Sequence, residues 1–301
     1  MNELLAYHYT SKEAFLNIIN NMLQAKDSNT CFEFWASSCF CLNDYIELKH
    51  GYKVLMELLK EEERDRDERY RLSNIHNEIK MEGMTDEKVY NFILDNSFIM
   101  ERIPYVISFS FMPEQIPLWS MYGGKGKGVC LCFDLNEILE FSRQEMQGLS
   151  FVPIVYNIDT IQSEYKKMIK DTIIIELDNY YNNVKEITDS EQIWYKKLSV
   201  IRVMCTVLSP YFKHLSFEFE NEYRLVKYCG PTENVEYRVN SNGYIIPYVK
   251  IKVPFNSLKK ITIGPCADYK LDSSIIHSYM KYCDPKHYVP IEPSLVPLRN
   301  I

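Results

Sequence analysis

A cluster of glycines near the middle of the chain most constrains how it can fold. Four of the ten glycines in this 301-residue chain lie between positions 123 and 128, in the run GGKGKG. Glycine reaches backbone conformations that other residues avoid, so this density predicts a tight turn. The helical pattern before the run ends at Tyr122, and the apolar run 128–133 predicts a strand after it.

The position of this turn bears on whether it binds phosphate. A glycine-rich loop that holds phosphate groups lies between a strand and the following helix, and a P-loop has the spacing GxxxxGK[ST]. Here the loop follows a helix and precedes a strand, and that spacing is missing. We therefore expect a structural turn with two exposed lysines, Lys125 and Lys127, which can still contact a ligand phosphate.

Apolar periodicity along the rest of the chain predicts the α+β class. We expect a single domain, 1–301, with a mixed sheet and helical insertions near 45–100 and 159–209. The predicted strands cover 5–9, 33–37, 104–110, 128–133, 216–228, 244–253 and 259–264. The predicted helices begin after a cap at Thr10 or Ser11, run through 48–72, follow Thr85 over 86–96, and cover 113–122, 159–184, 189–209 and 272–281, with a turn at 42–44.

The charge balance limits the class of partner. The chain has 34 Lys and Arg against 41 Asp and Glu, a net charge of −7, and a pI near 5.5. A chain of this charge does not coat nucleic acid non-specifically, but a local basic patch stays open. The mixed charge run 61–69 is typical of a solvated helical face. The candidates for a basic patch are Lys125, Lys127, Lys213 and Arg224.

Cysteine usage and hydropathy predict a cytoplasmic protein. The nine cysteines include no CxxC pair, so we expect free thiols in a reducing compartment and no metal site. The pairs 39/41 and 130/132 stand two residues apart on predicted strands, which places each pair on one face. The stretch 1–10 lacks a signal-peptide pattern, and no apolar run is long enough to cross a bilayer, so no membrane partner is expected.

Two places carry residues suited to chemistry. His8 differs from the other five histidines because it lies in the first predicted strand between Tyr7 and Tyr9, and it is open to a structural or a ligand-binding interpretation. On the predicted strand 216–228, Glu220, Glu222 and Arg224 share one face. That face is either solvated with a local ion pair or part of a cleft in which the guanidinium keeps one carboxylate ionised. The opposite, apolar face is expected to hold Phe217, Phe219, Tyr223 and Leu225.

In their order, these segments resemble the ADP-ribosyltransferase fold, a split mixed β-sheet core with helical insertions. Residues 7–11 are similar to the first strand of transferases of the His-Tyr-Glu type and to the opening of the DarT nucleic-acid ADP-ribosyltransferases. The strand–helix–strand 107–131 is similar to the part of poly(ADP-ribose) polymerases that surrounds nicotinamide, and 219–223 resembles the strand with the catalytic glutamate. The set YHYTS, LND, SFS, LWSMYG, GVCLCFD and FENEYRLV also resembles a bacterial family of uncharacterised domains, and the likeness covers the strands across 5–265.

The resemblance implies an enzyme that consumes NAD as a co-substrate. Glu222 would stabilise the positive charge that develops on the ribose as nicotinamide leaves, and Glu220 would activate the acceptor as a general base. His8 would donate a hydrogen bond to the adenosine ribose. Tyr122 or Trp119 would stack on nicotinamide, with Ser108 or Ser110 on its amide. The residues expected to bind NAD are His8, Tyr9, Thr10, Ser108, Phe109, Ser110, Trp119, Tyr122 and Arg224.

Two departures from the family pattern leave the acceptor open. Phe109 stands where many of these transferases have Tyr, and His8 stands where the Glu-x-Glu transferases that modify arginine have Arg. The likeness to DarT suggests DNA or RNA as the acceptor, whereas the net charge favours protein. Relatives of this kind serve as toxins or phage-defence effectors, which implies an antitoxin or another regulatory partner. The alternatives are an NAD glycohydrolase that depletes NAD, and a non-catalytic interaction module with a degenerate transferase fold.

Overall fold

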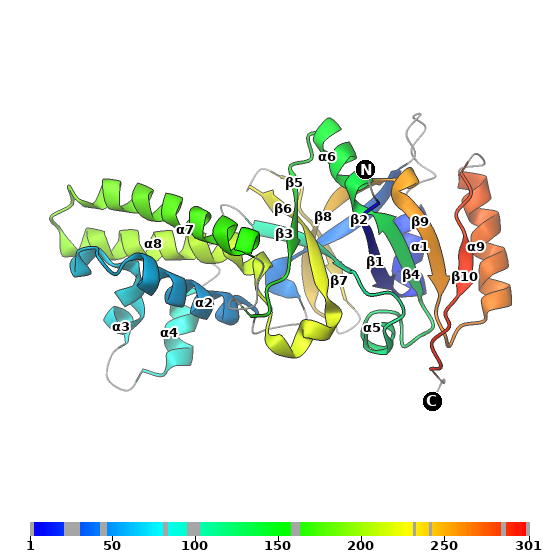
Figure 1. Cartoon of the computed structure of the whole chain (residues 1–301), viewed down its shortest axis with the longest axis horizontal. Helices are drawn as coiled ribbons and strands as arrows, with labels where there is room; N and C mark the ends of the chain where they lie inside the picture. Colours follow the sequence, from blue (N-terminus) through cyan, green and yellow to red (C-terminus); the bar gives the residue numbers. More distant parts are fainter. Residues whose placement is uncertain are drawn as a thin grey trace.

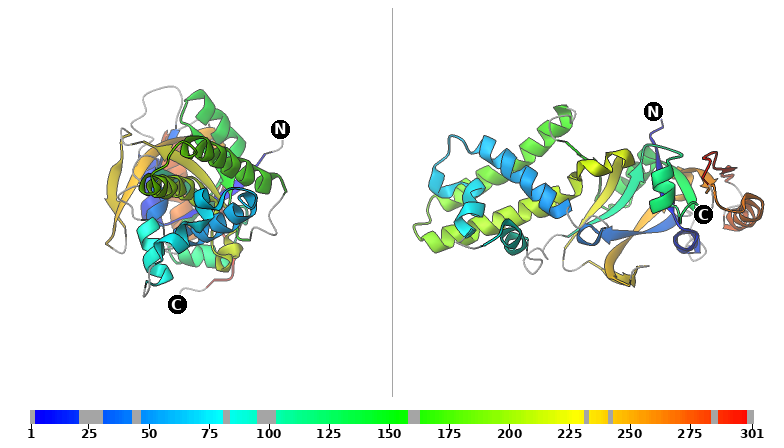
Figure 2. Two further views of the ribbon diagram at one scale, coloured as in Figure 1. Left: turned by 90° about the vertical axis from the view of Figure 1, so that its left-hand side faces the viewer. Right: turned by 90° about the horizontal axis from the view of Figure 1, so that it is seen from below.

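The chain folds into two lobes that lie end to end (Figure 1). In a computed structural model, a large β-sheet forms one lobe and long helices form the other; we call them the sheet lobe and the helical lobe. Two further views show the helical lobe at one end of the molecule (Figure 2). In the described part of the chain, no helix is both long enough and apolar enough to span a membrane. The described residues are 3–20, 31–42, 47–80, 84–94, 103–157, 163–230, 233–240, 243–283 and 287–298.

The sheet lobe confirms the α+β class, because the described residues form ten strands in one mixed sheet. The strand order is β10-β9-β4-β1-β3-β2-β8-β7, and β6 pairs with β3 and with β5. β10 pairs with β9 in parallel, and the other pairings are antiparallel. The strands are β1 (Leu5–Thr10), β2 (Cys31–Ser38), β3 (Ile103–Ser110), β4 (Val129–Asp134), β5 (Leu149–Pro153), β6 (Glu222–Cys229), β7 (Glu236–Val239), β8 (Ile245–Pro254), β9 (Leu258–Ile263) and β10 (Ile291–Pro293).

The sheet divides along one edge of β3. β1 pairs with this edge at Tyr7–Ser110, and β2 pairs with it at Tyr105 and Val106. Between these points, the described strands leave the edge around Ser108 without a ladder partner. Because backbone groups at such an edge still need hydrogen bonds, side chains or a ligand must satisfy them.

Four helices cover the sheet. Three pack on the main hydrophobic core, and the fourth packs on the opposite face beside Tyr9 and Cys130. Of the two predicted caps, Ser11 is the one used, since its Oγ accepts a hydrogen bond from the backbone N–H of Ala14 at 3.1 Å. The first three helices are α1 (Lys12–Asn20), α6 (Leu135–Gln144) and α9 (Tyr269–Cys283), and the fourth is α5 (Ile116–Met121).

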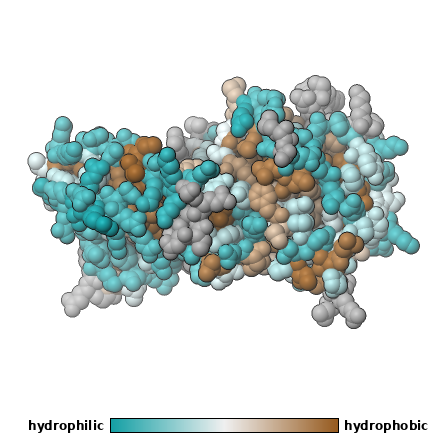
Figure 3. Space-filling model, in the orientation of Figure 1, coloured by the Kyte–Doolittle hydropathy of each residue, from teal (hydrophilic) through white to brown (hydrophobic). Residues whose placement is uncertain are grey.

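The two predicted helical insertions pack on each other in a second hydrophobic core, which fills the helical lobe. Thr85 caps its helix as predicted, because its side chain accepts a hydrogen bond from the backbone N–H of Lys88. On the face shown in Figure 3, the surface of this lobe is mostly hydrophilic, whereas apolar residues gather over the sheet lobe. The helices are α2 (Glu47–Glu62), α3 (Ile75–Ile79), α4 (Asp86–Ile93), α7 (Ser163–Val184) and α8 (Ser190–Leu208).

The predicted helix 48–72 is too long, and the charge run within it is not uniformly solvated. α2 ends just before Glu63, whose side chain is fully buried. The Glu63 carboxylate accepts hydrogen bonds from the backbone N–H groups of Leu72 and Ser73, both at 2.8 Å, and from the Tyr181 hydroxyl at 3.0 Å. Charge patterning cannot detect this, because the N–H groups that need an acceptor lie beyond the end of the helix.

Other predictions differ from the structure at the ends of elements. The helix predicted over 113–122 begins at Ile116, and the strand predicted over 216–228 begins at Glu222 as β6. The 39/41 cysteine pair lies in a 3₁₀ turn, not on a strand. The strands β5, β7 and β10 and the helix α6 are not predicted from the sequence. Most of the predicted turn 42–44 and the last residues of the predicted helix 86–96 lie outside the described residues.

Candidate functional site

A cavity of about 720 Å³ opens where the sheet divides. Residues of β1, β2, β3 and β6 line it, together with α1, α5 and the 3₁₀ helix η7 (Leu215–Glu220). Ligand pockets typically enclose roughly 300–1,000 Å³, so the volume of this cavity lies within the range of small-molecule sites. Ten of the eleven predicted site residues line it, and Trp119 does not. The ten are His8, Tyr9, Thr10, Ser108, Phe109, Ser110, Tyr122, Glu220, Glu222 and Arg224.

Two carboxylates and two cations form a buried group on the cavity wall, which we call the four-charge cluster. Lys213 Nζ donates to Oε2 of Glu220 at 2.6 Å and to Oε2 of Glu222 at 2.9 Å. Arg224 holds both oxygens of Glu222, with Nε 2.8 Å from Oε1 and Nη2 3.2 Å from Oε2. All four side chains are almost fully buried, so each charge depends on its partners rather than on water.

The chain brings Glu220 and Glu222 together without placing them on one strand. Glu220 ends η7, Asn221 adopts the left-handed conformation at φ 41°, and Glu222 begins β6. Asn tolerates this conformation better than most residues, which lets the chain turn within one residue. The predicted single strand with an alternating apolar face is therefore wrong, and Phe219 is 41% exposed. The two carboxylates still meet, because Lys213 bridges them.

The four-charge cluster separates the two carboxylates in their affinity for a proton. Burial raises the pKa of Glu220, against the lowering effect of Lys213 and with a further rise from the charge of Glu222. Burial acts on Glu222 in the same direction, but Arg224 and Lys213 together lower its pKa to about 2. At neutral pH Glu222 is ionised, and Glu220 is the carboxylate that takes up a proton more readily.

His8 satisfies the open edge of β3. Its Nδ1 donates to the backbone carbonyl of Ser108 at 2.9 Å. Burial lowers the pKa of His8 despite this bond, so the ring is neutral at pH 7. A neutral imidazole that donates through Nδ1 presents an acceptor at Nε2. Nε2 therefore accepts a hydrogen bond in this tautomer, which differs from the donor role that the resemblance implies for His8.

Trp119 is buried away from the cavity, which rules out the predicted stacking role. Its side chain is 0% exposed and packs edge-on against Tyr9, with the ring centroids 5.1 Å apart. Tyr122, at the end of α5, lines the cavity, and its hydroxyl donates to Oε1 of Glu220 at 2.9 Å. Because residues three apart on a helix share a face only in part, the sequence alone does not show which of the two rings turns toward the cavity.

Several of the predicted binding residues already use their polar groups to shape the cavity. The Tyr9 hydroxyl donates to the Met112 carbonyl at 3.1 Å and accepts from the Gln115 N–H at 3.2 Å, which fixes the segment before α5. The Ser110 hydroxyl donates to the Glu220 carbonyl at 2.6 Å, which holds η7 against β3. Thr10 and Phe109 are buried, at 6% and 2% exposure.

The glycine turn is structural, as predicted. A Cβ atom on Gly128 would lie 2.1 Å from the Thr10 carbonyl oxygen, and one on Gly264 would lie 2.3 Å from the Gly126 carbonyl oxygen. Gly126 also adopts a left-handed conformation at φ 79°. The turn packs directly against β1 and the residue after β9, so its glycines serve close backbone approach.

The predicted basic patch does not form one surface. Lys213 and Arg224 are buried in the four-charge cluster and neutralised by its carboxylates. Lys125 and Lys127 are exposed on the glycine turn, and Lys125 lines the cavity. Of the two lysines that the sequence left open for a ligand phosphate, Lys125 is the one that lines the cavity.

The residues that support the carboxylates are not evident from the local sequence. The sequence predicts Lys213 only as part of a surface patch. No pattern marks Tyr156, whose hydroxyl accepts a hydrogen bond from the backbone N–H of Glu222 at 2.9 Å. No sequence pattern predicts that Trp35 of β2 and Arg238 of β7 line the cavity. These side chains meet through strand pairing, which no local spacing encodes.

The described residues offer no metal site. They contain no group of three or more His, Cys, Asp or Glu placed to hold a metal ion. The eight cysteines whose side chains are described are free thiols. Burial raises the pKa of Cys130 and Cys132, which share one face of β4 as predicted, so neither is a ready thiolate.

Comparison with known proteins adds a family match over part of the chain. Residues 118–225 match DUF2971, a family described as protein of unknown function. The matched stretch begins in α5 and ends in β6, so it contains Tyr122 and the four-charge cluster. No curated protein and no solved structure matches the chain.

Proposed function

We propose that this protein is an ADP-ribosyltransferase that uses NAD as co-substrate and modifies a macromolecular acceptor. The observation that carries the proposal is the meeting, around one cavity, of ten residues that the resemblance implied as a set, at the place where the sheet divides between β1 and β2. They come from four segments, which lie at 8–10, 108–110, 122 and 220–224. The division of the sheet is also in keeping with the split mixed sheet of the transferase fold.

The proposed reaction breaks the bond between nicotinamide and C1′ of its ribose. The bonding electron pair leaves with the nicotinamide nitrogen, and positive charge develops on C1′ and the ring oxygen. Glu222, ionised and held at both oxygens, presents a negative group that needs no reorganisation as this charge develops. Lys213 and Arg224 cancel part of the electric field of the Glu222 carboxylate. The proposed stabilisation therefore requires C1′ to lie on the carboxylate side of the four-charge cluster.

Transfer is completed when a nucleophile of the acceptor forms a new bond to C1′ and loses its proton. Glu220 takes that proton in the proposed mechanism, because its pKa is raised and its carboxylate lines the cavity. Tyr122, whose hydroxyl is bonded to Glu220, supplies the aromatic ring beside nicotinamide. His8 accepts a hydrogen bond from a ribose hydroxyl through Nε2.

The test uses NAD labelled in its adenylate part. Wild type and Glu222→Gln are incubated with this NAD in a bacterial lysate, and samples are digested separately with nuclease and with protease. We expect labelling of a macromolecule to fall by about 10²–10³-fold in Glu222→Gln. Glu218→Gln is the matched control, since Glu218 lies in η7 but is exposed to solvent, and it should label as wild type does.

The outcomes separate the proposed function from its alternatives. Loss of the label on nuclease digestion identifies nucleic acid as the acceptor, and loss on protease digestion identifies protein. Release of free ADP-ribose without macromolecular label supports an NAD glycohydrolase. If NAD stays intact with wild type in every lysate fraction, or if Glu222→Gln labels as well as wild type, the proposed mechanism is wrong.

A further inference from the structure

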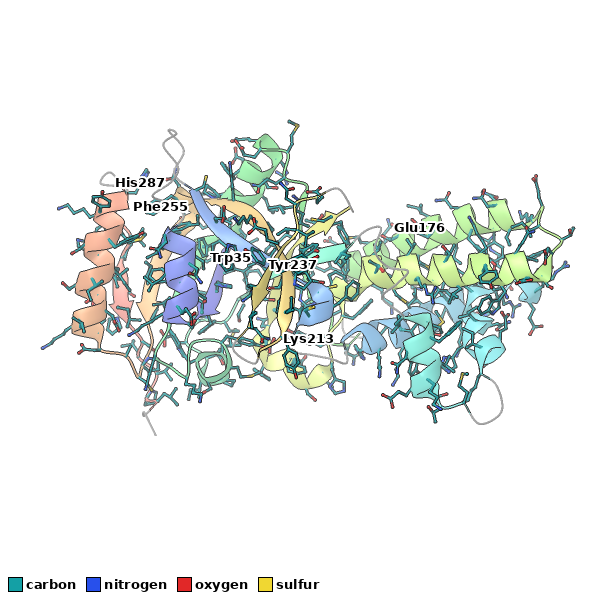
Figure 4. All side chains as sticks on the ribbon, turned by 180° about the vertical axis from the view of Figure 1, so that it is seen from behind. Trp35, Glu176, Lys213, Tyr237, Phe255 and His287 are labelled. Carbon is teal, nitrogen blue, oxygen red and sulfur yellow. The ribbon has the colours of Figure 1, made fainter. Side chains whose placement is uncertain are left out.

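The cavity contains a second polar region, away from the four-charge cluster, on β2 and β7. Trp35, Ser37 and Arg238 line it. Arg238 Nη2 donates to Ser37 Oγ at 2.9 Å, and Ser37 lies two residues from Trp35 on the same face of β2. Figure 4 shows Trp35 and Lys213 at separate places on the sheet lobe. The two regions are therefore different parts of one cavity wall.

Two buried N–H donors in this second region lack an acceptor. Among the described residues, four buried side-chain polar atoms have no hydrogen-bond partner, and Arg238 Nε and Trp35 Nε1 are two of them. Both groups are donors only, so they can be satisfied only by an acceptor. A buried donor without a partner destabilises the folded state, because it has given up its hydrogen bond to water. The two residues that carry these donors line one cavity, so a ligand with acceptor oxygens at this wall would satisfy them.

Arg238 is partly buried and differs from the two buried cations of the cavity in having no counter-ion. Lys213 and Arg224 are paired with carboxylates, whereas no carboxylate in the described part of the chain forms an ion pair with Arg238. Burial lowers the pKa of Arg238, but a guanidinium stays protonated at neutral pH. A charged and partly desolvated guanidinium of this kind favours an anion.

We propose that Arg238, Trp35 and Ser37 form a subsite that binds a phosphate group of the cavity ligand. A phosphate presents several acceptor oxygens to the guanidinium fork and the indole N–H, and Arg binds such groups through parallel hydrogen bonds. Trp35 is held for this by stacking on Tyr248, with ring centroids 4.7 Å apart and planes 25° apart. The subsite rests on the proposed function only in taking the phosphate from the diphosphate bridge of NAD.

The spacing of the two regions suits a dinucleotide. Ser37 pairs with Val106 on β3, and Glu222 pairs with Ser110 on the same strand. Four residues of strand separate these positions, about 13 Å at ~3.3 Å per residue. An extended dinucleotide can place its scissile bond at the four-charge cluster and its diphosphate nearer to Arg238.

The test measures binding by calorimetry with inorganic pyrophosphate, ADP-ribose, NAD and nicotinamide riboside, which has no phosphate. We expect Arg238→Gln to weaken ADP-ribose and NAD by about tenfold or more, as befits a charged hydrogen bond, and to leave nicotinamide riboside unchanged. Trp35→Phe keeps an aromatic ring, although a smaller one, and removes the N–H, so it should weaken the same ligands a few-fold. Lys252→Gln is the control, because it makes the same change in charge at an exposed position of β8 outside the cavity.

Each outcome tests the subsite separately from the enzyme activity. If wild type and Arg238→Gln bind ADP-ribose equally, with equal melting temperatures, the subsite is wrong while NAD cleavage can still stand. If pyrophosphate and ADP-ribose bind in an Arg238-dependent way but NAD is neither bound nor cleaved, the subsite stands and the proposed function fails. If wild type binds none of the phosphate probes, the inference is overturned.

Discussion

The pair of Glu222 and Arg224 gives the sharpest test of how the four-charge cluster is held together. Two hydrogen bonds of 2.8 and 3.2 Å join them, and the residues are 4% and 1% exposed. Arg224→Met removes the guanidinium and leaves Lys213 to serve both carboxylates. The cluster then carries a net negative charge in a buried site, which folding must accommodate.

Two figures set the scale of the stability that Arg224→Met would lose, one general and one from the pKa of Glu222. Removing one partner of a buried ion pair destabilises a protein by about 3–5 kcal/mol. The pKa of Glu222, lowered from 4.5 to about 2 mainly by Arg224 and Lys213 against the effect of burial, corresponds to about 3 kcal/mol of folding free energy. Arg224 and Lys213 share the second figure, so the first one applies to the loss of Arg224. We expect Arg224→Met to lower the free energy of unfolding by about 3 kcal/mol or more at pH 7.

The pH dependence of folding stability gives a second test of Glu222, with a definite direction. Because the pKa of Glu222 is lower in the folded than in the unfolded chain, its contribution is complete above about pH 4.5 and is lost as the pH falls toward 2. Between these values, the melting temperature of wild type should fall more steeply than that of Glu222→Gln. Urea unfolding at pH 7 and thermal unfolding at several acidic pH values, both followed by circular dichroism, measure the two effects.

Two further variants make the reasoning refutable. The double variant Glu222→Gln/Arg224→Met removes both charges and should be more stable than Arg224→Met alone. Arg69→Met removes an exposed guanidinium and should cost less than about 1 kcal/mol. The account of the cluster is refuted if Arg224→Met unfolds within 1 kcal/mol of wild type, or if the double variant is no more stable than the single one.

Two other predictions follow from buried carboxylates. Lys213→Met removes the charge that lowers the pKa of Glu220, so this pKa rises further. The acidic limb of the pH–rate profile for NAD cleavage should then move to higher pH, and an unmoved limb would show that Glu220 does not accept the proton. Glu63→Gln should lower the free energy of unfolding by about 1.5–3 kcal/mol, whereas Glu61→Gln, at an exposed ion pair, should lower it by less than about 1 kcal/mol. Equal melting temperatures for the two variants would contradict the capping role of Glu63.

Local physics in the sequence determined the elements and the chemistry-bearing segments. Ser11 and Thr85 cap helices because a short polar side chain reaches the free N–H groups two or three residues on. The glycine density around Gly128 required a tight turn, because there is no room for a side chain there. His8 and the Glu220–Glu222 pair stood out because their residue types are suited to acid–base and ligand chemistry.

Tertiary structure alone decided how these groups are used. Lys213 reaches both carboxylates because Asn221 turns the chain between η7 and β6, which converts an expected strand face into a buried cluster. His8 became an acceptor because the sheet divides beside Ser108. Packing between strands far apart in the sequence buries Trp119 away from the cavity and places Trp35 and Arg238 on its wall. Periodicity reports the face that a residue occupies on its own element, whereas protonation and hydrogen bonding depend on neighbours that other elements supply.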